Sequence, residues 1–280
     1  MAAALHRLPR GRVDLTRIPT DATPGFEGNK KDGERALAAL GPELSDLQER
    51  LWAEGTRGSQ RRLLLVLQGM DTSGKGGVLR HTVGLVDPQG VRITSFKAPT
   101  PEELAHDFLW RIRRALPEPG YLGVFDRSHY EDVLIVRVHG LVEPKTIETR
   151  CDEINQFEAE LAADCVVIVK CLLHVSAEQQ RRRLLRRLDR KEKHWKFHPA
   201  DIDERTRWGD YRTAYQIALG RTNTDVAPWY VVPADRKWYR NLVVGRLLLD
   251  HLRGMNPQWP SPDCDIEEQR RRLLDEDPVS

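Results

Sequence analysis

A glycine-rich segment with one lysine, residues 69–76, has the composition and spacing of a phosphate-binding loop. Its sequence, GMDTSGKG, fits the pattern G-x-x-x-x-G-K. An apolar run at 62–67 precedes it and apolar residues at roughly helical spacing follow it, which favours such a loop over an ordinary glycine turn. Backbone N–H groups, the helix N-terminus and the lysine of such a loop face a phosphate. We therefore expect phosphate contacts from Gly69, Thr72, Ser73, Gly74, Lys75, Gly76, Gly77 and Arg80.

The loop lacks the hydroxyl group that commonly binds magnesium. Lys75 is followed by Gly76, where Ser or Thr is usual. Asp71 in the loop and Asp126 at the end of the apolar stretch 121–125 offer carboxylates instead. Since the carboxyl ends of parallel strands face one crevice, both are expected to hold Mg²⁺, with Mn²⁺ as an alternative. Asp126 could instead cap a helix or turn, but residues 127–132 place several polar groups directly behind it.

A second concentration of charge lies at 177–196, with nine Lys or Arg against three Asp or Glu. Ser176 and Gln179 predict a capping box, and Leu184, Leu185 and Leu188 predict an apolar stripe, which leaves the cations on the other faces of a helix. The run is either a solvated charged surface or a lid over bound phosphates. The phosphate-binding loop in the same chain favours the lid.

Aromatic residues near this run allow two interpretations. Trp208, Tyr211 and Tyr215 fall at helical spacing, which favours a lid core over a platform for base stacking. Trp195 lies between basic residues and could stack on an adenine or anchor the lid.

These motifs resemble those of the polyphosphate kinase 2 family. The resemblance rests on GxDxxGKGG at 69–77, DRSHYED at 126–132, HWKF at 194–197 and APWYVVPADRK at 227–237, and it covers roughly residues 12–260. It implies an α/β, P-loop kinase-like fold of three layers, a parallel sheet flanked by helices, with a helical lid. It also implies an enzyme that moves the terminal phosphoryl group of inorganic polyphosphate to a nucleotide, with magnesium and without a covalent intermediate.

The letters SHYED resemble most the branch that accepts nucleoside monophosphates as well as diphosphates. Glu131 marks this preference, since other branches more often read DRSWYN here. Two positions differ from the pattern. Met70 stands where the family commonly has arginine, and Asp126 stands where this branch often has asparagine. The resemblance places lid functions at Arg187, Lys193 and Asp201. The expected nucleotide-binding residues are His129, Tyr130, Glu131, Arg137 and Asp201.

The expected chemistry is phosphoryl transfer by positioning and electrostatics. Lys75 and the loop amides bind the donor, two carboxylates hold the metal, and two arginines stabilise charge on the transferred group. Asp71 could alternatively act as a base, although an acceptor phosphate is already largely ionised at neutral pH. The expected catalytic residues are Asp71, Lys75, Asp126, Arg127 and Arg187.

Two other functions fit part of the pattern. One is a P-loop nucleoside monophosphate kinase with a nucleoside triphosphate donor, and the other is a non-catalytic binder of RNA or another polyanion. The expected partners are inorganic polyphosphate and nucleotides, with nucleic acid disfavoured, in a homodimer or homotetramer. The chain of 280 residues has a formal net charge of +2, so attraction for a polyanion must come from local clustering. No apolar stretch approaches a membrane span and residues 1–10 lack a secretory segment, so a cytoplasmic enzyme without a membrane partner is expected.

The elements that must position these residues alternate along the chain. We predict strands at 62–67, 91–97, 121–125, 165–173 and 229–232, and helices at 31–54, 100–116, 146–163 and 238–253. Cys165 and Cys171 bracket one strand and are expected to be reduced core residues. The parts are an N-terminal arm and helix at 1–58, a core at 59–255 that includes a lid at about 177–220, and a C-terminal tail at 256–280 of undetermined order.

Overall fold

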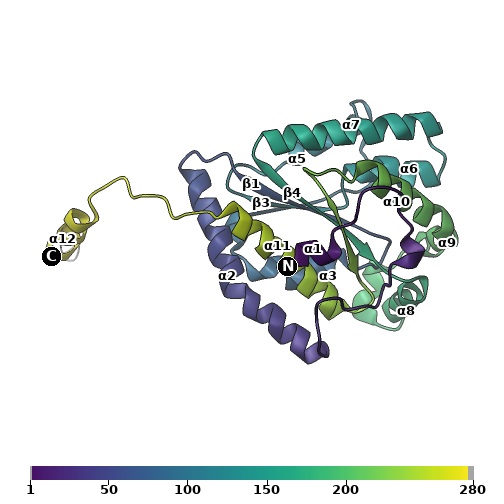
Figure 1. The fold of residues 1–280 in the computed structure, drawn as a ribbon, viewed down its shortest axis with the longest axis horizontal. Helices are drawn as coiled ribbons and strands as arrows, with labels where there is room; N and C mark the ends of the chain where they lie inside the picture. The colour runs from purple at the N-terminus through teal and green to yellow at the C-terminus, as the bar shows by residue number, and fades with distance from the viewer. Residues whose placement is uncertain (1, 277–280) are drawn as a thin grey trace.

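Five parallel strands form one sheet at the centre of the computed structural model, which describes residues 2–276 (Figure 1). Their order is β2-β3-β1-β4-β5, and every neighbouring pair is parallel. The central strand β1 is buried from Leu63 to Gln68, as its continuous apolar run predicts. The strands are β1 (Arg62–Gln68), β2 (Val91–Ser95), β3 (Leu122–Asp126), β4 (Val166–His174) and β5 (Trp229–Pro233).

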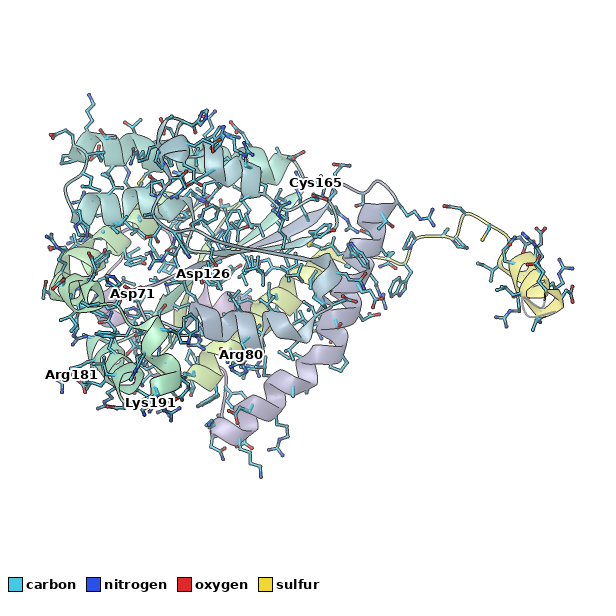
Figure 2. All side chains as sticks on the ribbon, turned by 180° about the vertical axis from the view of Figure 1, so that it is seen from behind. Asp71, Arg80, Asp126, Cys165, Arg181 and Lys191 are labelled. Atoms are coloured by element: carbon cyan, nitrogen blue, oxygen red, sulfur yellow. The ribbon has the colours of Figure 1, made fainter. Side chains whose placement is uncertain are left out.

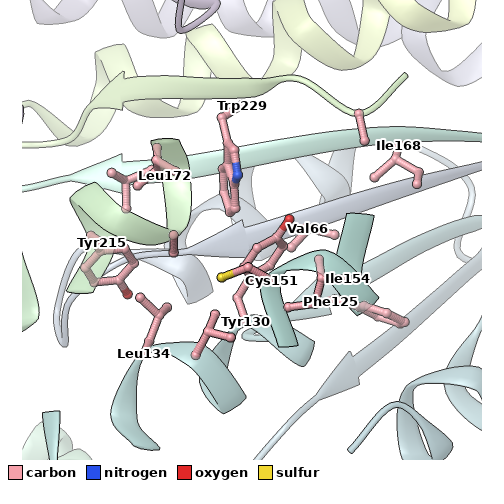
Figure 3. Packing of buried hydrophobic residues seen from close by; sticks show 14 of the residues in the cluster. Val66, Phe125, Tyr130, Leu134, Cys151, Ile154, Ile168, Leu172, Tyr215 and Trp229 are labelled. Carbon is pink, nitrogen blue, oxygen red and sulfur yellow. The ribbon is translucent and has the colours of Figure 1, made fainter. Parts of the chain in front are cut away.

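Helices cover both faces of this sheet, which confirms the predicted three-layer α/β fold. One apolar cluster, part of which is drawn in Figure 3, joins the sheet to α5 (Trp110–Ala115), α7 (Pro144–Ala163) and α10 (Trp208–Thr222). A second cluster lies on the other face and includes buried residues of α2 (Lys30–Thr56), α3 (Lys75–His81) and α11 (Lys237–Met255). The sheet is therefore held between two apolar interfaces.

Shorter helical segments connect these elements. Between the strands and the long helices lie α4 (Pro101–Leu104), α6 (Ile135–Val138), α8 (Ala177–Leu188) and α9 (Ala200–Thr206). Single 3₁₀ turns lie at η1 (Leu15–Arg17), η2 (Val83–Leu85), η3 (Pro88–Gly90), η4 (His129–Val133) and η5 (Lys191–Lys196).

Two local predictions were wrong. The helix expected at 100–116 is divided into α4 and α5, because the side chain of Asp107 accepts a hydrogen bond from the Leu109 N–H and starts a new helical segment. A capping box of Thr100 and Glu103 starts α4. Cys165 is exposed with φ 59°, just before β4, so only Cys171 of the two cysteines is a core residue.

The N-terminal arm packs along the edge of the sheet. It begins with α1 (Ala2–His6), and the Leu8 N–H then donates to the Trp229 carbonyl oxygen of β5. Leu8, Val13 and Leu15 are buried in the cluster of the α7 face. The arm thus covers a strand edge that would otherwise be open to pairing.

The C-terminal tail extends away from the body. After α11, an extended segment leads to α12 (Ile266–Asp275), which Figure 1 shows apart from the other elements. Trp259 of the extended segment lies under the guanidinium of Arg50, and Asp263 forms an ion pair with Arg57. None of the helices within residues 2–276 is long and apolar enough to span a membrane.

Candidate active site

The phosphate-binding loop lies where the order of the sheet reverses. β1 pairs with β3 on one side and with β4 on the other, and Leu67 of β1 is opposite Asp126 of β3. Crevices at such a switch point are the usual ligand sites of open parallel sheets. Gly74, with φ 110°, is the N-cap of α3, and Lys75 is its first residue. The loop, its lysine and the end of β3 therefore lie together at the carboxyl ends of the strands, where the sequence predicted a crevice.

The loop contains polar groups that point inward without partners. The Lys75 ammonium donates to the Gly69 carbonyl oxygen at 2.9 Å, and burial, with Arg127 second, lowers its pKa. The hydroxyl oxygens of Thr72 and Ser73 are buried and have no hydrogen-bond partner among residues 2–276. Unpaired buried donors are costly, so this loop is prepared for an acceptor such as a phosphate oxygen.

Arg127 joins the loop to the segment after β3. Its guanidinium lies 3.1 Å from a carboxylate oxygen of Asp71 and 4.0 Å from Glu131. The backbone of Arg127 has φ 65°, a left-handed conformation that is rare for arginine and is typical of functional sites. The Gln68 amide links Ser128 and Glu131, and burial raises the pKa of Glu131 although Arg127 and Lys75 oppose this.

Asp71 and Asp126 fit a magnesium ion that is held in part by phosphates. Figure 2 labels both residues, and both side chains are partly exposed to the crevice. No group of three or more His, Cys, Asp or Glu side chains with metal-binding geometry occurs in the described chain. Mg²⁺ is commonly bound through one or two carboxylates together with substrate phosphates and waters. Two carboxylates beside a phosphate-binding loop are such a partial ligand set.

His129 and Tyr130, which were expected to bind the nucleotide, lie in the core instead. Their side chains are 1% and 0% exposed. The Tyr130 hydroxyl donates to Glu158 at 2.8 Å, and His129 is 3.3 Å from the same carboxylate. Both side chains make their contacts with the core in this structure, and nucleotide binding by these two residues stays a prediction.

A buried ion pair stabilises the segment that begins at the end of β3, residues 126–132. The Lys170 ammonium of β4 donates to Glu158 at 2.6 Å, to the Tyr130 hydroxyl at 2.8 Å and to the Thr222 carbonyl at 2.8 Å. Burial raises the pKa of Glu158, but Lys170 and His129 outweigh it and hold it below the usual value. Breaking such a pair typically costs about 3–5 kcal/mol, so it anchors residues 126–132 behind the crevice.

The basic run forms helix α8, but its buried face differs from the prediction. Gln180, Arg183 and Leu184 are buried, whereas Leu185 and Leu188 are 49% and 45% exposed. Helical spacing puts residues 180, 183, 184 and 187 on one face, and that face packs on the phosphate-binding loop. The apolar stripe predicted from three leucines was therefore wrong at two of them.

Side chains of α8 contact the loop directly. The Gln180 amide donates to the Asp71 carbonyl oxygen at 3.2 Å, and Arg183 donates to those of Thr72 and Ser73 at 2.8 and 3.0 Å. Ser176 caps the helix by accepting from the Gln179 N–H, but the Gln179 side chain donates to the Asp235 carbonyl and does not complete a capping box. The lid is thus connected to the loop by two side chains that sequence reasoning did not single out.

The remaining predicted residues are distributed around this centre. Arg187 forms an ion pair with Asp201 at 3.2 Å and donates to the Lys196 carbonyl, so it connects α8, η5 and α9. Lys193 is half-buried on η5, Arg137 is half-buried on α6, and Arg80 is exposed on α3. Within residues 2–276, no side-chain hydrogen bond or ion pair joins any of these four residues to the loop, and their roles remain predictions.

The aromatic residues differ in their burial. Tyr215 is 5% exposed and lies in the apolar cluster between the sheet and α7, so it belongs to the core of the body, although a lid core was expected. Trp195 is 78% exposed, with its indole N–H donating to Glu192 and the Lys196 ammonium over its ring. Trp195 is therefore a free aromatic surface on η5 and not an anchor of the lid.

Comparison with known proteins identifies the family. Residues 27–260 match the family described as Polyphosphate kinase 2. The chain belongs to this family. A crystal structure of polyphosphate kinase 2 from Arthrobacter aurescens superimposes with a TM-score of 0.95 at 48% identity and covers 98% of this chain and 97% of that one.

Two relatives are similar over nearly their whole length. The chain is 46% identical over 259 residues to the AMP/ADP-polyphosphate phosphotransferase of Meiothermus ruber, covering 92% of this chain and 96% of the relative. It is 40% identical over 261 residues to the ADP-polyphosphate phosphotransferase of Rhodopseudomonas palustris, covering 89% of each. This polyphosphate kinase 2 family member is therefore an enzyme, a phosphotransferase, and the expectation of a non-catalytic binder is set aside.

Proposed function

We propose that this enzyme transfers the terminal phosphoryl group of inorganic polyphosphate to AMP and ADP. The observation that carries the proposal is the similarity to the Meiothermus ruber AMP/ADP-polyphosphate phosphotransferase over 92% of the chain. The crevice supports it, because Lys75, Asp71, Asp126 and Arg127 meet at one edge of the sheet with cations above and below the loop. A polyphosphate end and a nucleotide phosphate both require such groups.

The donor end binds at the phosphate-binding loop in this proposal. Lys75 exchanges its contact with the Gly69 carbonyl for a phosphate oxygen, and the loop N–H groups and the Thr72 and Ser73 hydroxyls donate to others. Arg127 lies between Asp71 and Glu131, where it can orient the transferred group relative to the acceptor. Preorganised positive groups stabilise the charge that spreads over a transferring phosphoryl group.

Asp71 and Asp126 hold Mg²⁺ in this proposal, or Mn²⁺ in its place. An ion held by these two carboxylates would supply positive charge that offsets the charge developing on the transferred phosphoryl group. Glu131 shapes the acceptor side, because its carboxylate lies within reach of Arg127 and faces the same crevice. Arg187, Asp201 and Lys193 act in the lid, Arg80 and Arg137 remain proposed phosphate and nucleotide contacts, and the assembly is a homodimer or homotetramer.

A donor screen with purified protein tests the function. Polyphosphate with AMP and Mg²⁺, and without any nucleoside triphosphate, should yield ADP and then ATP. Lys75→Ala serves as the control, since it should abolish transfer without changing the melting temperature. Turnover of AMP only with a nucleoside triphosphate donor would contradict the proposal and support a nucleoside monophosphate kinase.

A further inference from the structure

Two arginines lie behind the phosphate-binding loop, on the side of its carbonyl oxygens. Arg240 of α11 donates to the Ser73 carbonyl at 3.1 Å, and Arg183 of α8 donates to the Thr72 and Ser73 carbonyls. The loop N–H groups face the phosphate, so its carbonyl oxygens face away from it. The two guanidinium groups therefore form a second cationic layer that a bound phosphate does not touch.

The charge of Arg240 has no carboxylate partner. Its side chain is 2% exposed, its other hydrogen bonds go to the Asn241 amide oxygen, and no ion pair of Arg240 occurs within residues 2–276. Burial, followed by the charge of Arg183, lowers the pKa of Arg240 to about 9, which leaves it charged at neutral pH. A buried charge without a counter-ion is destabilising, because hydrogen bonds to neutral groups replace only part of its hydration.

A third cation extends this layer to the surface. Lys237 lies at the start of α11, and partial burial, followed by Arg183, Arg186, Arg240 and Lys193, lowers its pKa to about 8. Burial is the largest cause of this shift, and four nearby cations add to it. Asp235 offsets part of the charge of Arg183, whereas no such carboxylate in the described part of the chain acts on Arg240.

We propose that Arg240, supported by Arg183, raises the affinity of the loop for polyphosphate through the loop backbone, with the bound phosphates supplying the missing counter-charge. Arg240 is thus a positioning residue that acts on donor binding without contacting the donor. This inference rests on the proposed function, in which a polyanionic phosphate chain occupies the loop. It assigns the loop a low stability when empty and a specific gain in stability when phosphates bind.

Glycines in the loop agree with this arrangement. A Cβ atom at Gly74 would lie 1.7 Å from Arg240 Nη1, and one at Gly77 would lie 2.4 Å from Nη2. The guanidinium thus occupies the space that side chains at both positions would need. The position of Arg240 is by itself a sufficient reason for glycine at position 77.

Binding of tripolyphosphate, measured by calorimetry without an acceptor nucleotide, tests the proposal. Arg240→Met removes the charge at similar volume, and the Ser73 carbonyl stays paired because Arg183 also donates to it. Arg240→Lys keeps the charge. Arg253→Met is the control, because it removes an exposed charge from the same helix at about 20 Å from Arg240.

The variants have distinct expected outcomes. Arg240→Met should raise the Kd of tripolyphosphate about tenfold or more and reduce its dependence on salt, as expected for one unscreened charge at close range. Arg240→Lys should recover most of the affinity, and Arg253→Met should bind like the parent. Without ligand, Arg240→Met should melt close to the parent temperature, because the loss of its two hydrogen bonds to Asn241 offsets the removal of an unpaired buried charge, and tripolyphosphate should stabilise it less.

Two results would overturn the proposal. The first is a folded Arg240→Met protein with the parent Kd and salt dependence. The second is a ligand-free Arg240→Met protein that melts well below the parent, since that would make Arg240 a structural brace. The AMP transfer assay decides the proposed function separately, because tripolyphosphate binding needs no acceptor and no turnover.

Discussion

The two positions after Lys75 are both glycine, but for different physical reasons. A Cβ at Gly76 would meet no atom within 4 Å, whereas one at Gly77 would meet Arg240 at 2.4 Å. Gly76→Ser should therefore change the free energy of unfolding by no more than about 0.5 kcal/mol, and Gly77→Ala should lower it by about 1–3 kcal/mol. Urea denaturation of both variants checks this. Equal losses at the two positions would show that the backbone, and not Arg240, requires glycine.

Metal binding should depend on both proposed carboxylates. Asp71→Asn and Asp126→Asn each remove one hard anionic oxygen, so the magnesium concentration for half-maximal turnover should rise about tenfold or more. Manganese should restore part of the activity. Asp164→Asn is the matched control, because Asp164 pairs with Arg62 at the opposite end of β1. If both variants keep the magnesium dependence of the parent enzyme, another pair of residues must bind the metal.

The depressed pKa of Lys237 predicts a pH dependence of phosphate binding. Lys237 is cationic below about pH 8 and loses its charge as the pH rises through that value, while Arg240 nearby, with a pKa of about 9, stays charged to higher pH. The ratio of the Kd values of Lys237→Gln and the parent cancels the titration of tripolyphosphate itself. This ratio should be largest below pH 8 and approach one above it. A ratio that does not vary with pH would place Lys237 outside the electrostatic reach of the loop.

The sequence predicted the residues at the centre of the site but not the residues that hold them in place. Local sequence patterns single out Lys75, Asp71, Asp126 and Arg127. The order of the strands then brings these residues together. Arg240 contacts Ser73 across 167 positions of sequence, in a helix whose pattern shows only apolar packing. A residue whose role depends on such a distant contact leaves no local signal, and this also holds for Lys170 and Glu158.

At the level of elements, α8, η5 and α9 meet at Arg187, and we expect these elements to act as the lid. Arg187 pairs with Asp201 and donates to the Lys196 carbonyl in this structure, so it has contacts to exchange on closure. If it then reaches the transferred phosphoryl group, Arg187→Ala should lower kcat about a hundredfold or more. The exposed Arg181 on the same helix is the control, and Arg181→Ala should change kcat little.

Asp201→Asn separates two roles for Arg187. If Arg187 only holds the lid together, loss of either partner should lower kcat equally. If it acts on the phosphoryl group, Asp201→Asn should retain much more activity than Arg187→Ala. Equal, small losses in Arg187→Ala and Arg181→Ala would leave only a diffuse cationic surface, and the assigned lid role would be withdrawn.

Element boundaries followed from the sequence where apolar periodicity was strong. All five strands and the long helices α2, α7 and α11 lie within a few residues of their predicted ends. Prediction failed where polar side chains decide the structure. Asp107 divides the expected helix at 100–116, and the buried face of α8 contains Gln180 and Arg183 because carbonyl groups of the loop need donors there.

At the scale of the whole molecule, the tail is separable from the catalytic body. Residues up to Asp263 contact α2, through the pairs of Trp259 with Arg50 and of Asp263 with Arg57. Beyond them, α12 has ten residues, and its Leu273 and Leu274 are 77% and 80% exposed. An isolated helix shorter than about 12 residues is marginal in water, so α12 contributes little to the stability of the fold.

Deletion of residues 264–280 should therefore leave the melting temperature, kcat and KM at parent values. The same truncated protein should keep the oligomeric mass of the parent in light scattering, because the proposed dimer or tetramer is assigned to the body. A loss of mass with an unchanged melting temperature would instead show that the exposed leucines of α12 pack on a second copy of the chain. A loss of activity that accompanies the loss of mass would make assembly, and not only the crevice of one subunit, a requirement for phosphoryl transfer.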